Sequence, residues 1–327
     1  MKTQVLGTDT AEELAVAVTT AVRLLREGAV VALPTETVYG LAADALSVDA
    51  ALRIFEAKER PRFDPLIVHL PDLTWLDRVT QIEPAQSQLV RALAERFWPG
   101  PLTFVLTRSA IVPDVVTAGL NTVAVRMSAH PVFAAIVSAF GSPLAAPSAN
   151  RFGRISPTAA SHVAAELDTR ISLIVDAGAT TFGIESTIIA IRRNTIEILR
   201  RGPVTSEQLS EYAHVEIADA GAKMRAPGQL PSHYAPRTPL VLTSDLATFA
   251  LPSGKRVGAL GWRGLVPTSF AEVRTLSTTG DFHEAAANLF RHLRELDDAQ
   301  LDLIVAETLP EHGLGSAIMD RLRRAAA

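Results

Sequence analysis

The chain of 327 residues contains no cysteine, and this absence excludes several kinds of chemistry. Without thiols it forms no disulfide, holds no metal through thiolates and has no cysteine nucleophile. Aromatic residues make up only 6%, and the net charge is −4. The composition therefore argues against thiol chemistry and against a protein that binds nucleic acid through a uniformly basic surface.

Long apolar runs are also missing. The best candidate, residues 132–147, is interrupted by Ser138, Gly141 and Pro143 and is too short to span a bilayer. The first residues, MKTQVLGTDTAEEL, have no apolar core of the kind found in signal peptides. We expect a soluble cytoplasmic protein with no membrane partner.

Several common catalytic motifs are absent as well: the P-loop G-x-x-x-x-G-K-[ST], the elbow G-x-S-x-G and the zinc motif H-E-x-x-H. HGLGS at 312–316 lacks the third glycine of a dinucleotide fingerprint and is interpreted as a turn between a strand and a helix. No motif predicts a structural metal site, so any Mg²⁺ would be carried on substrate phosphates.

The sequence does contain an alternation of helical and strand patterns. Thr10 and Glu13 form a capping box for a helix that ends at Gly28, and Ser47 opens a second helix that ends near Arg60. Further helices are expected near 84–97, 131–140 and 157–168, and strands at 29–34, 66–70, 102–107, 123–127, 143–147 and 172–178, with a hairpin over 186–201. This mixture predicts an α/β domain with a twisted mixed sheet over residues 1–210.

The C-terminal part, residues 239–327, has its own pattern. Strands are expected at 239–243, 256–262 and 301–307, with one helix at 282–296 and a last one from Gly315. These elements predict a small parallel α/β domain of Rossmann-like type. Between the domains, residues 211–238 show no clear helix or strand. The prolines of APGQLPSHYAPRTP (226–239) stiffen this segment, which indicates an ordered linker.

Two early motifs suggest a ligand site. PTETVYGLAADA follows a strand, so hydroxyls and a carboxylate lie at its carboxyl end, where open α/β sheets bind ligands, although a turn in which Gly40 serves only backbone geometry is the alternative. KERPRFDPLIVHL places Lys58, Arg60 and Arg62 on one proline-stiffened segment, as a polyphosphate would require, although a solvated helix end is the alternative. His69 in the same motif is either a core residue or a ligand-binding residue.

Two later motifs add an anion site. Arg126 lies within an apolar strand and needs an anionic partner, either an internal carboxylate (Glu36 or Glu185) or a substrate carboxylate. APSANRFGRISPT (146–158) runs from a strand to a helix N-terminus and forms a potential anion cradle, although a capped surface loop is the alternative. Ser186 and Arg200, at strand ends, are weaker candidates.

Together, PTETVYGLAADA, KERP-x-x-x-PLIVHL, FWPGPLTFVL, VAVRMSAHP, APSANRFGRISPT and PSHYAP resemble the two-domain form of the L-threonylcarbamoyladenylate synthase family. The resemblance implies a YrdC-like twisted mixed sheet with a large open cavity, followed by a smaller Rossmann-like domain. It also implies a nucleotidyltransferase that makes threonylcarbamoyl-AMP and diphosphate from L-threonine, bicarbonate and ATP with Mg²⁺. The product would serve a downstream tRNA-modifying complex that forms N6-threonylcarbamoyladenosine.

The resemblance also assigns residues. ATP would be bound by Lys58, Arg60, Thr122, Ser148, Asn150, Ser156, Arg200 and Tyr234. L-Threonine would be bound by Thr35, His69, Arg126, Ala146 and Ser186. We further expect the linker to act as a lid in which His233 and Tyr234 meet ATP and shield the labile intermediate.

Two other function classes are weighed against this one. An RNA-binding or ribosome-associated module would be expected to interleave more aromatic residues with its cations. A carbamoyltransferase of the hydrogenase-maturation type shares the YrdC-like domain, but it carries further regions, including a cysteine-rich zinc-binding one, for which this cysteine-free chain has no room.

Overall fold

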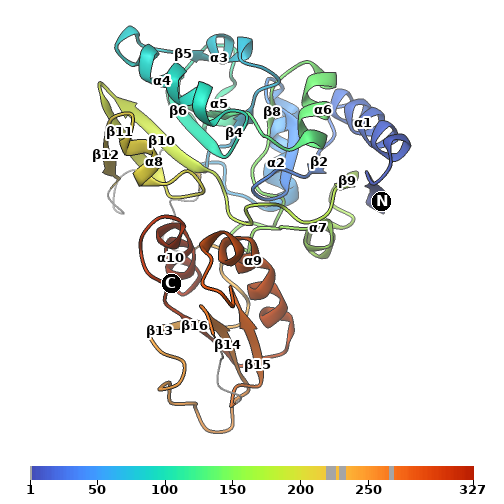
Figure 1. The fold of residues 1–327 in the computed structure, drawn as a ribbon. Helices are drawn as coiled ribbons and strands as arrows, with labels where there is room; N and C mark the ends of the chain where they lie inside the picture. The colour runs from blue at the N-terminus through green and yellow to red at the C-terminus, as the bar shows by residue number, and fades with distance from the viewer. Residues whose placement is uncertain (1, 219–225, 228–232, 265–268) are drawn as a thin grey trace. The chain divides into compact units, whose positions relative to one another are not determined.

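A computed structural model describes residues 2–218, 226–227, 233–264 and 269–327 (Figure 1). The chain divides into two compact units. The first comprises Met1–Phe152, Pro157–Thr180 and Glu185–Gln229, and the second comprises Gly153–Ser156, Thr181–Ile184 and Leu230–Ala327. The search of the described residues found no helix with the length and apolar character needed to cross a membrane.

One large mixed sheet forms the centre of the first unit. Its order is β1-β9-β2-β3-β8-β4-β7-β6-β10-β11-β12, with β5 paired to β6, and it contains both parallel and antiparallel neighbours. The strands are β1 (Gln4–Gly7), β2 (Val31–Leu33), β3 (Gly40–Asp44), β4 (Ile67–His69), β5 (Thr80–Gln81), β6 (Leu102–Arg108), β7 (Thr122–Arg126), β8 (Leu144–Ala145), β9 (Leu173–Asp176), β10 (Thr187–Arg192), β11 (Thr195–Arg200) and β12 (His214–Ile217). The predicted mixed α/β fold is confirmed.

Two helices of this unit begin at the side-chain caps that the sequence predicts. Thr10 forms the predicted capping box with Glu13, and the Ser47 side chain accepts from the Ala50 amide. The helices are α1 (Ala11–Arg26), α2 (Val48–Lys58), α3 (Thr74–Val79), α4 (Pro84–Phe97), α5 (Asp114–Thr117), α6 (Pro131–Phe140), α7 (Ala160–Leu167) and α8 (Ser206–Ser210).

Helix α7 starts later than the predicted 157–168. The Pro157 carbonyl accepts from the Tyr39 amide at 2.9 Å, and the Thr158 carbonyl accepts from the Thr180 amide at 2.9 Å. Because these carbonyls bond to distant segments, the helix begins only at Ala160.

A second difference concerns the linker. The expectation that 211–238 contains no strand is wrong, since His214–Ile217 pairs with β11 as strand β12. Residues 219–225 and 228–232 of this segment lie outside the described residues.

The two faces of the large sheet carry different side chains. One face packs on the main core, with Val68, Phe104 and Val125 among its buried residues. On the other face, Leu144 and other strand residues pack with residues of α1 and α6, including Phe133, in one cluster. A second cluster on that face contains Ile67, Val105, Ala124, Ile188, Ala190, Leu199 and Ala226. The candidate site occupies the same face as these two clusters.

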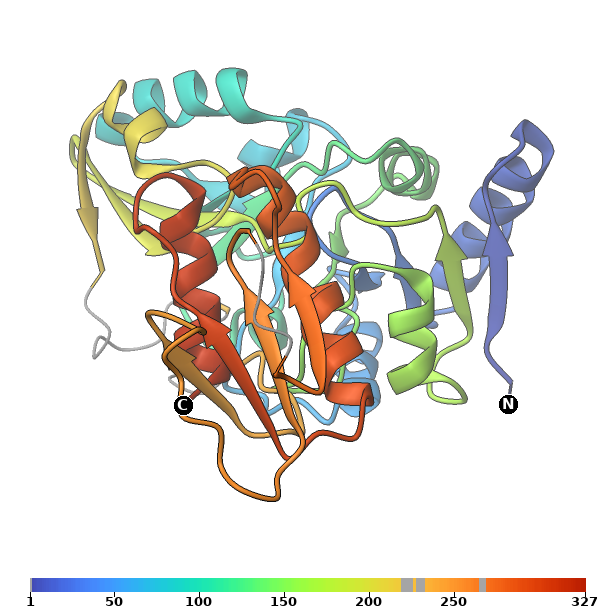
Figure 2. The ribbon, with the colours of Figure 1, turned by 60° about the horizontal axis from the view of Figure 1, so that its bottom comes forward.

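The second unit has a four-stranded, all-parallel sheet in the order β13-β16-β14-β15. Its elements are β13 (Leu240–Thr243), β14 (Val257–Gly261), β15 (Glu272–Thr275), α9 (Phe282–Asp298), β16 (Leu303–Glu307) and α10 (Leu314–Ala325). Figure 2 shows its strands, orange to red, beside the two helices. The predicted parallel α/β unit is confirmed, with β15 as an additional edge strand in which Glu272 and Arg274 form an ion pair.

Candidate active site

A row of residues crosses the large sheet at the ends of several strands. His69 on β4 pairs with Arg126 on β7. One further step in the register between β6 and β7 puts Thr103 opposite Arg126. Thr103 pairs with Ile188 on β10, and Ile188 pairs with Arg200 on β11. Because paired residues project from the same face, the polar side chains of this row share one surface.

Arg126 is at the centre of this row and is buried, with 3% of its surface exposed. Its Nη2 donates to Glu36 Oε1 at 2.5 Å, and its Nη1 donates to Thr37 Oγ1 at 3.2 Å. Glu36 also accepts a hydrogen bond from Ser128 Oγ. The structure therefore supplies the internal carboxylate that the sequence offered as one alternative, while Arg126 Nε has no hydrogen-bond partner among the described residues.

Thr35 is linked to this ion pair through Thr37, and His69 pairs with Arg126 in the sheet. The Thr35 hydroxyl donates to the Val38 carbonyl at 2.7 Å and lies 2.9 Å from Thr37 Oγ1, which links it to Arg126. Burial, together with the charge of Arg126, holds the pKa of His69 well below its ordinary value. His69 is therefore neutral at physiological pH and packs on the Phe133 ring, with centroids 4.9 Å apart.

Ser186 bridges two members of this row, Thr103 and Arg200. The Ser186 hydroxyl lies 2.8 Å from Thr103 Oγ1 and accepts from Arg200 Nη2 at 3.1 Å. Arg200 Nε donates to the Ser186 carbonyl at 3.1 Å, and its Nη1 donates to the Pro227 carbonyl at 3.4 Å. These bonds fix the guanidinium against neutral oxygen atoms.

Lys58 ends α2 and is buried, and among the described residues no carboxylate is in hydrogen-bond contact with it. Its Nζ donates to the Ser148 carbonyl at 2.6 Å and to the Asn150 carbonyl. Burial, and then the charge of Arg60, holds the pKa of Lys58 well below its usual range. Ser148 is itself placed by a bridge to Gly40. An ammonium that meets only carbonyl oxygens can still gain from an anionic ligand.

Asp64, which sequence reasoning missed, lies among the cations. Arg60 Nη2 is 2.8 Å from Asp64 Oδ2, and Asp64 is fully buried. Both of its carboxylate oxygens lack a well-aligned hydrogen bond within the described residues. Burial raises the pKa of Asp64, while the charges of Arg60, Lys58 and Arg200 oppose this rise. The charges of three predicted ATP-binding cations therefore favour the ionised form of one carboxylate.

The remaining first-unit candidates lie on the same sheet. Thr122 starts β7 and is on the face of Arg126, about 13 Å along the strand. The Ala146 amide donates to the Ile67 carbonyl at 2.9 Å, beside β4. His69, Thr122, Arg126 and Arg200 therefore share one face of the sheet, whereas Lys58 ends helix α2, which packs on the main core.

Ser156, His233 and Tyr234 belong to the second unit. All three are buried. Their assignment to ATP stays a prediction.

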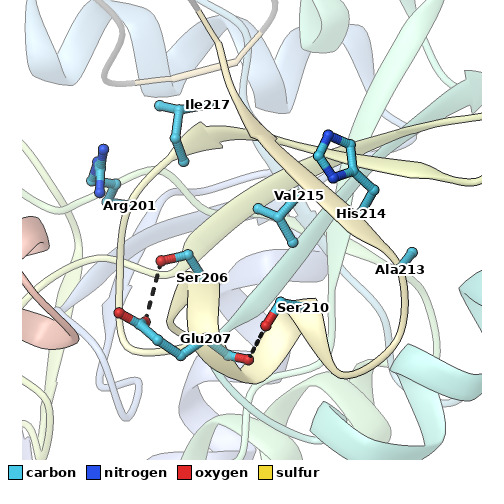
Figure 3. Close-up of a pocket in the computed structure, with 8 residues that line it drawn as sticks. All are labelled: Arg201, Ser206, Glu207, Ser210, Ala213, His214, Val215 and Ile217. Atoms are coloured by element: carbon cyan, nitrogen blue, oxygen red, sulfur yellow. Dashed lines mark hydrogen bonds between the residues drawn. The ribbon is translucent and has the colours of Figure 1, made fainter.

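A separate surface pocket of about 630 Å³ lies beside β12 and α8 (Figure 3). Its lining residues are Arg201, Ser206, Glu207, Ser210, Ala213, His214, Val215 and Ile217. Within it, the Ser206 and Ser210 hydroxyls donate to Glu207. None of the predicted site residues lines this pocket, so it is distinct from the row of Arg126.

Sequence reasoning also missed Thr103 and Ser128, and it left the Glu36–Arg126 pair open. Thr103 gives no local signal, because its hydroxyl meets Ser186 from a strand far away in the sequence. Asp64 lies within the KERPRFDP motif. Its position next to three cations in that motif could have identified it as a site residue. Among the described residues, no three His, Asp or Glu side chains gather to hold a metal ion.

Comparison with known proteins gives matches along the whole chain. The Sua5/YciO/YrdC family model, described as telomere recombination, matches residues 23–202. A model described as the C-terminal domain of threonylcarbamoyl-AMP synthase matches residues 204–327. The threonylcarbamoyl-AMP synthase of Bacillus subtilis is 41% identical over 100% of this chain and 98% of that protein.

Archaeal relatives match in sequence and in structure. The threonylcarbamoyl-AMP synthase of Pyrococcus abyssi is 41% identical over 92% of this chain and 91% of that protein. A crystal structure of Pyrococcus abyssi Sua5 complexed with L-threonine has a TM-score of 0.88 at 38% identity. That comparison covers 100% of this chain and 98% of the other.

Proposed function

We propose that this chain, which belongs to the threonylcarbamoyl-AMP synthase family, makes threonylcarbamoyl-AMP and diphosphate from L-threonine, bicarbonate and ATP. The observation that carries this proposal is the buried polar row on one face of the large sheet, with Arg126 at its centre and Arg200 at its end. Lys58 and Arg60 lie in the same unit and share Asp64 with Arg200. This arrangement suits an amino-acid carboxylate beside a polyphosphate.

In this proposal, Arg126 binds the carboxylate of L-threonine. A guanidinium presents its donors as a planar fork that matches a carboxylate. Arg126 Nε has no hydrogen-bond partner among the described residues, and Glu36 holds the opposite side of the group. Thr35, His69, Ala146 and Ser186 complete the threonine site, and the neutral imidazole adds no charge beside the amine.

The phosphates of ATP would be bound by the cations and the small polar loop. Lys58 donates to carbonyl oxygens and Arg60 pairs with Asp64, so an incoming polyphosphate would add negative charge beside these cations and Arg200. Ser148, Asn150 and Thr122 belong to the same proposed site. Ser156, His233 and Tyr234 are included from the family motif, with His233 and Tyr234 acting as a lid.

The chemistry proposed for this site needs positioning more than a covalent nucleophile. The threonine amine captures bicarbonate as a carbamate with loss of water, and a carbamate oxygen then attacks the α-phosphorus of ATP. The bond to the β-phosphate oxygen breaks, and diphosphate leaves. Lys58, Arg60 and Arg200 would stabilise the charge that develops on the phosphates.

Mg²⁺ fits this site as a companion of ATP. The donors around the proposed phosphate site are mainly cations and hydroxyls, so the ion would be held by phosphate oxygens and water, as Mg²⁺ prefers. When bound, it would neutralise charge on the departing diphosphate. We further propose that the protein acts in the cytoplasm and that a tRNA-modifying enzyme consumes the labile product.

A direct incubation tests the function. The full chain is mixed with ATP, L-threonine, bicarbonate and Mg²⁺, and diphosphate release is followed with mass detection of the adenylate. We expect diphosphate only when both threonine and bicarbonate are present. Release that persists without threonine, or a complete absence of the adenylate, would contradict the proposal. An exposed-surface variant, Arg91→Gln, serves as the matched control for Arg126→Gln.

A further inference from the structure

Tyr234 has a backbone conformation that large side chains rarely adopt. Its φ is 65°, in the left-handed region, and such a conformation persists only where the surroundings hold it. The residues on both sides are fixed by main-chain bonds within the second unit. The His233 amide donates to the Arg324 carbonyl at 3.2 Å, and the Ala235 amide donates to the Gly153 carbonyl at 3.0 Å.

The ring of Tyr234 is held by the two C-terminal helices. Phe290 of α9 stacks on it, with centroids 5.5 Å apart and planes inclined by 28°. The guanidinium carbon of Arg321 on α10 lies 5.2 Å from the ring centroid. Phe290 and Arg321 are fully buried, and Arg321 pairs with Asp320 at 2.8 Å. A buried cation near an aromatic ring attracts it more strongly than an exposed one does.

Helix α9 also contacts the other segment of the second unit that contains a residue assigned to ATP. Arg294 of α9 donates to the Ile155 carbonyl, next to Ser156 in the chain. Contacts from α9 and α10 therefore reach both segments of the second unit, 153–156 and 233–235, that contain predicted ATP-binding residues. An aliphatic residue would fill a core position at lower electrostatic cost than buried Arg321.

We propose that Arg321 and Phe290 are positioning residues that set the orientation of Tyr234, and that the C-terminal helices control ATP affinity through this ring. This inference rests on the proposed function, in which Tyr234 contacts ATP. In this proposal both residues act through the Tyr234 ring and not through contact with the substrate. The role that we assign to the C-terminal domain is thus a mechanical one in the synthase reaction.

The test compares two charge-removing substitutions on one helix. Arg321→Gln removes the cation near the ring, whereas the control Arg323→Gln removes an exposed cation that pairs with Glu311. We expect Arg321→Gln to raise the KM for ATP about 3- to 20-fold, with the KM for threonine changed less than about twofold. Arg321→Lys should restore part of the loss. Arg323→Gln should behave as wild type.

A double-variant cycle separates positioning from general packing. In a Tyr234→Ala background, Arg321→Gln should change the KM for ATP less than about twofold, because the ring through which it acts is gone. An equal fold-change in both backgrounds overturns the proposal. Phe290→Leu, judged in the same way, keeps the test decisive if Arg321→Gln does not fold, and an unchanged KM in folded single variants also overturns it.

The proposed function can fail separately. If wild type and Arg323→Gln form no threonylcarbamoyl-AMP, the synthase assignment is wrong. ATP affinity from thermal shift, measured on the same variants, then judges the positioning role without turnover. A dependence on Arg321 that disappears in Tyr234→Ala supports the positioning role, and its absence contradicts it.

Discussion

Replacing Arg126 or its partner tests the centre of the site. The Arg126–Glu36 pair is buried on both sides, at 3% and 7% side-chain exposure, with 2.5 Å between the charged groups. Removing one member of a buried pair leaves an uncompensated charge and costs about 3–5 kcal/mol. We therefore expect Glu36→Gln and Arg126→Gln each to lower the free energy of unfolding by roughly this amount, while the double variant loses less than the sum.

The two substitutions should differ in their effect on substrate binding. Loss of one charge-assisted hydrogen bond costs about 1.5–3 kcal/mol, so Arg126→Gln should raise the KM for threonine about 10- to 100-fold. Urea unfolding measures the first effect, and steady-state diphosphate release measures the second. If Arg126→Gln folds and its threonine KM stays within about twofold of wild type, Arg126 does not bind the carboxylate and this reasoning is wrong.

Three further predictions concern pH, a close backbone contact and the metal. The pKa of His69 in the folded protein is held well below its ordinary value. Below about pH 6.5, His69 therefore takes up a proton in the unfolded chain but not in the folded protein. Protonation favours the unfolded chain, so the free energy of unfolding decreases as pH falls. Replacing His69 with glutamine should flatten that decrease by up to about 1.4 kcal/mol per pH unit in urea unfolding between pH 7 and 5, and an unchanged pH dependence would contradict this reasoning. Gly202→Ala would bring a Cβ to 2.4 Å from the Thr187 amide nitrogen. We expect this clash to lower the free energy of unfolding in urea by about 1–3 kcal/mol and, by displacing Ser186, to raise the KM for threonine. Wild-type values for both quantities would contradict this contact. Chelation of Mg²⁺ should stop diphosphate release without lowering the melting temperature of the ATP-free protein, and a lower temperature would indicate a structural metal.

The elements that sequence predicts well are those specified by nearby residues. Thr10 and Glu13 are three positions apart, and their capping box forms as expected. Strands β3, β12 and β15 were missed or left out because each is short and gains its stability from partners elsewhere in the chain. In β3, for example, Ala43 pairs with Ala145, about a hundred residues away.

The candidate site follows the same rule. Motifs identify Lys58, Arg126 and Arg200 as chemically unusual positions, because cations within apolar segments need partners. They do not show which oxygens those cations meet, since that depends on the register of strands that lie far apart in sequence. Glu36 next to Arg126, and Thr103 next to Ser186, are results of sheet order and are visible only in the fold.

The partners of these cations differ in a way that matches the two proposed substrates. Arg126 already has a full carboxylate partner in Glu36, so a bound threonine would share an existing ion pair and add few new charges. Lys58 instead donates to two carbonyl oxygens, Arg200 donates to Ser186 and Pro227, and Arg60 lies 2.8 Å from the buried carboxylate of Asp64. Burying the Lys58 ammonium among carbonyl oxygens costs stability, and an anionic phosphate would relieve that cost when it binds. In the proposed function, the Arg126–Glu36 pair would hold the zwitterionic amino acid, Lys58 and its neighbouring cations would hold the phosphates of ATP, and the carbamate would form where the two substrates meet.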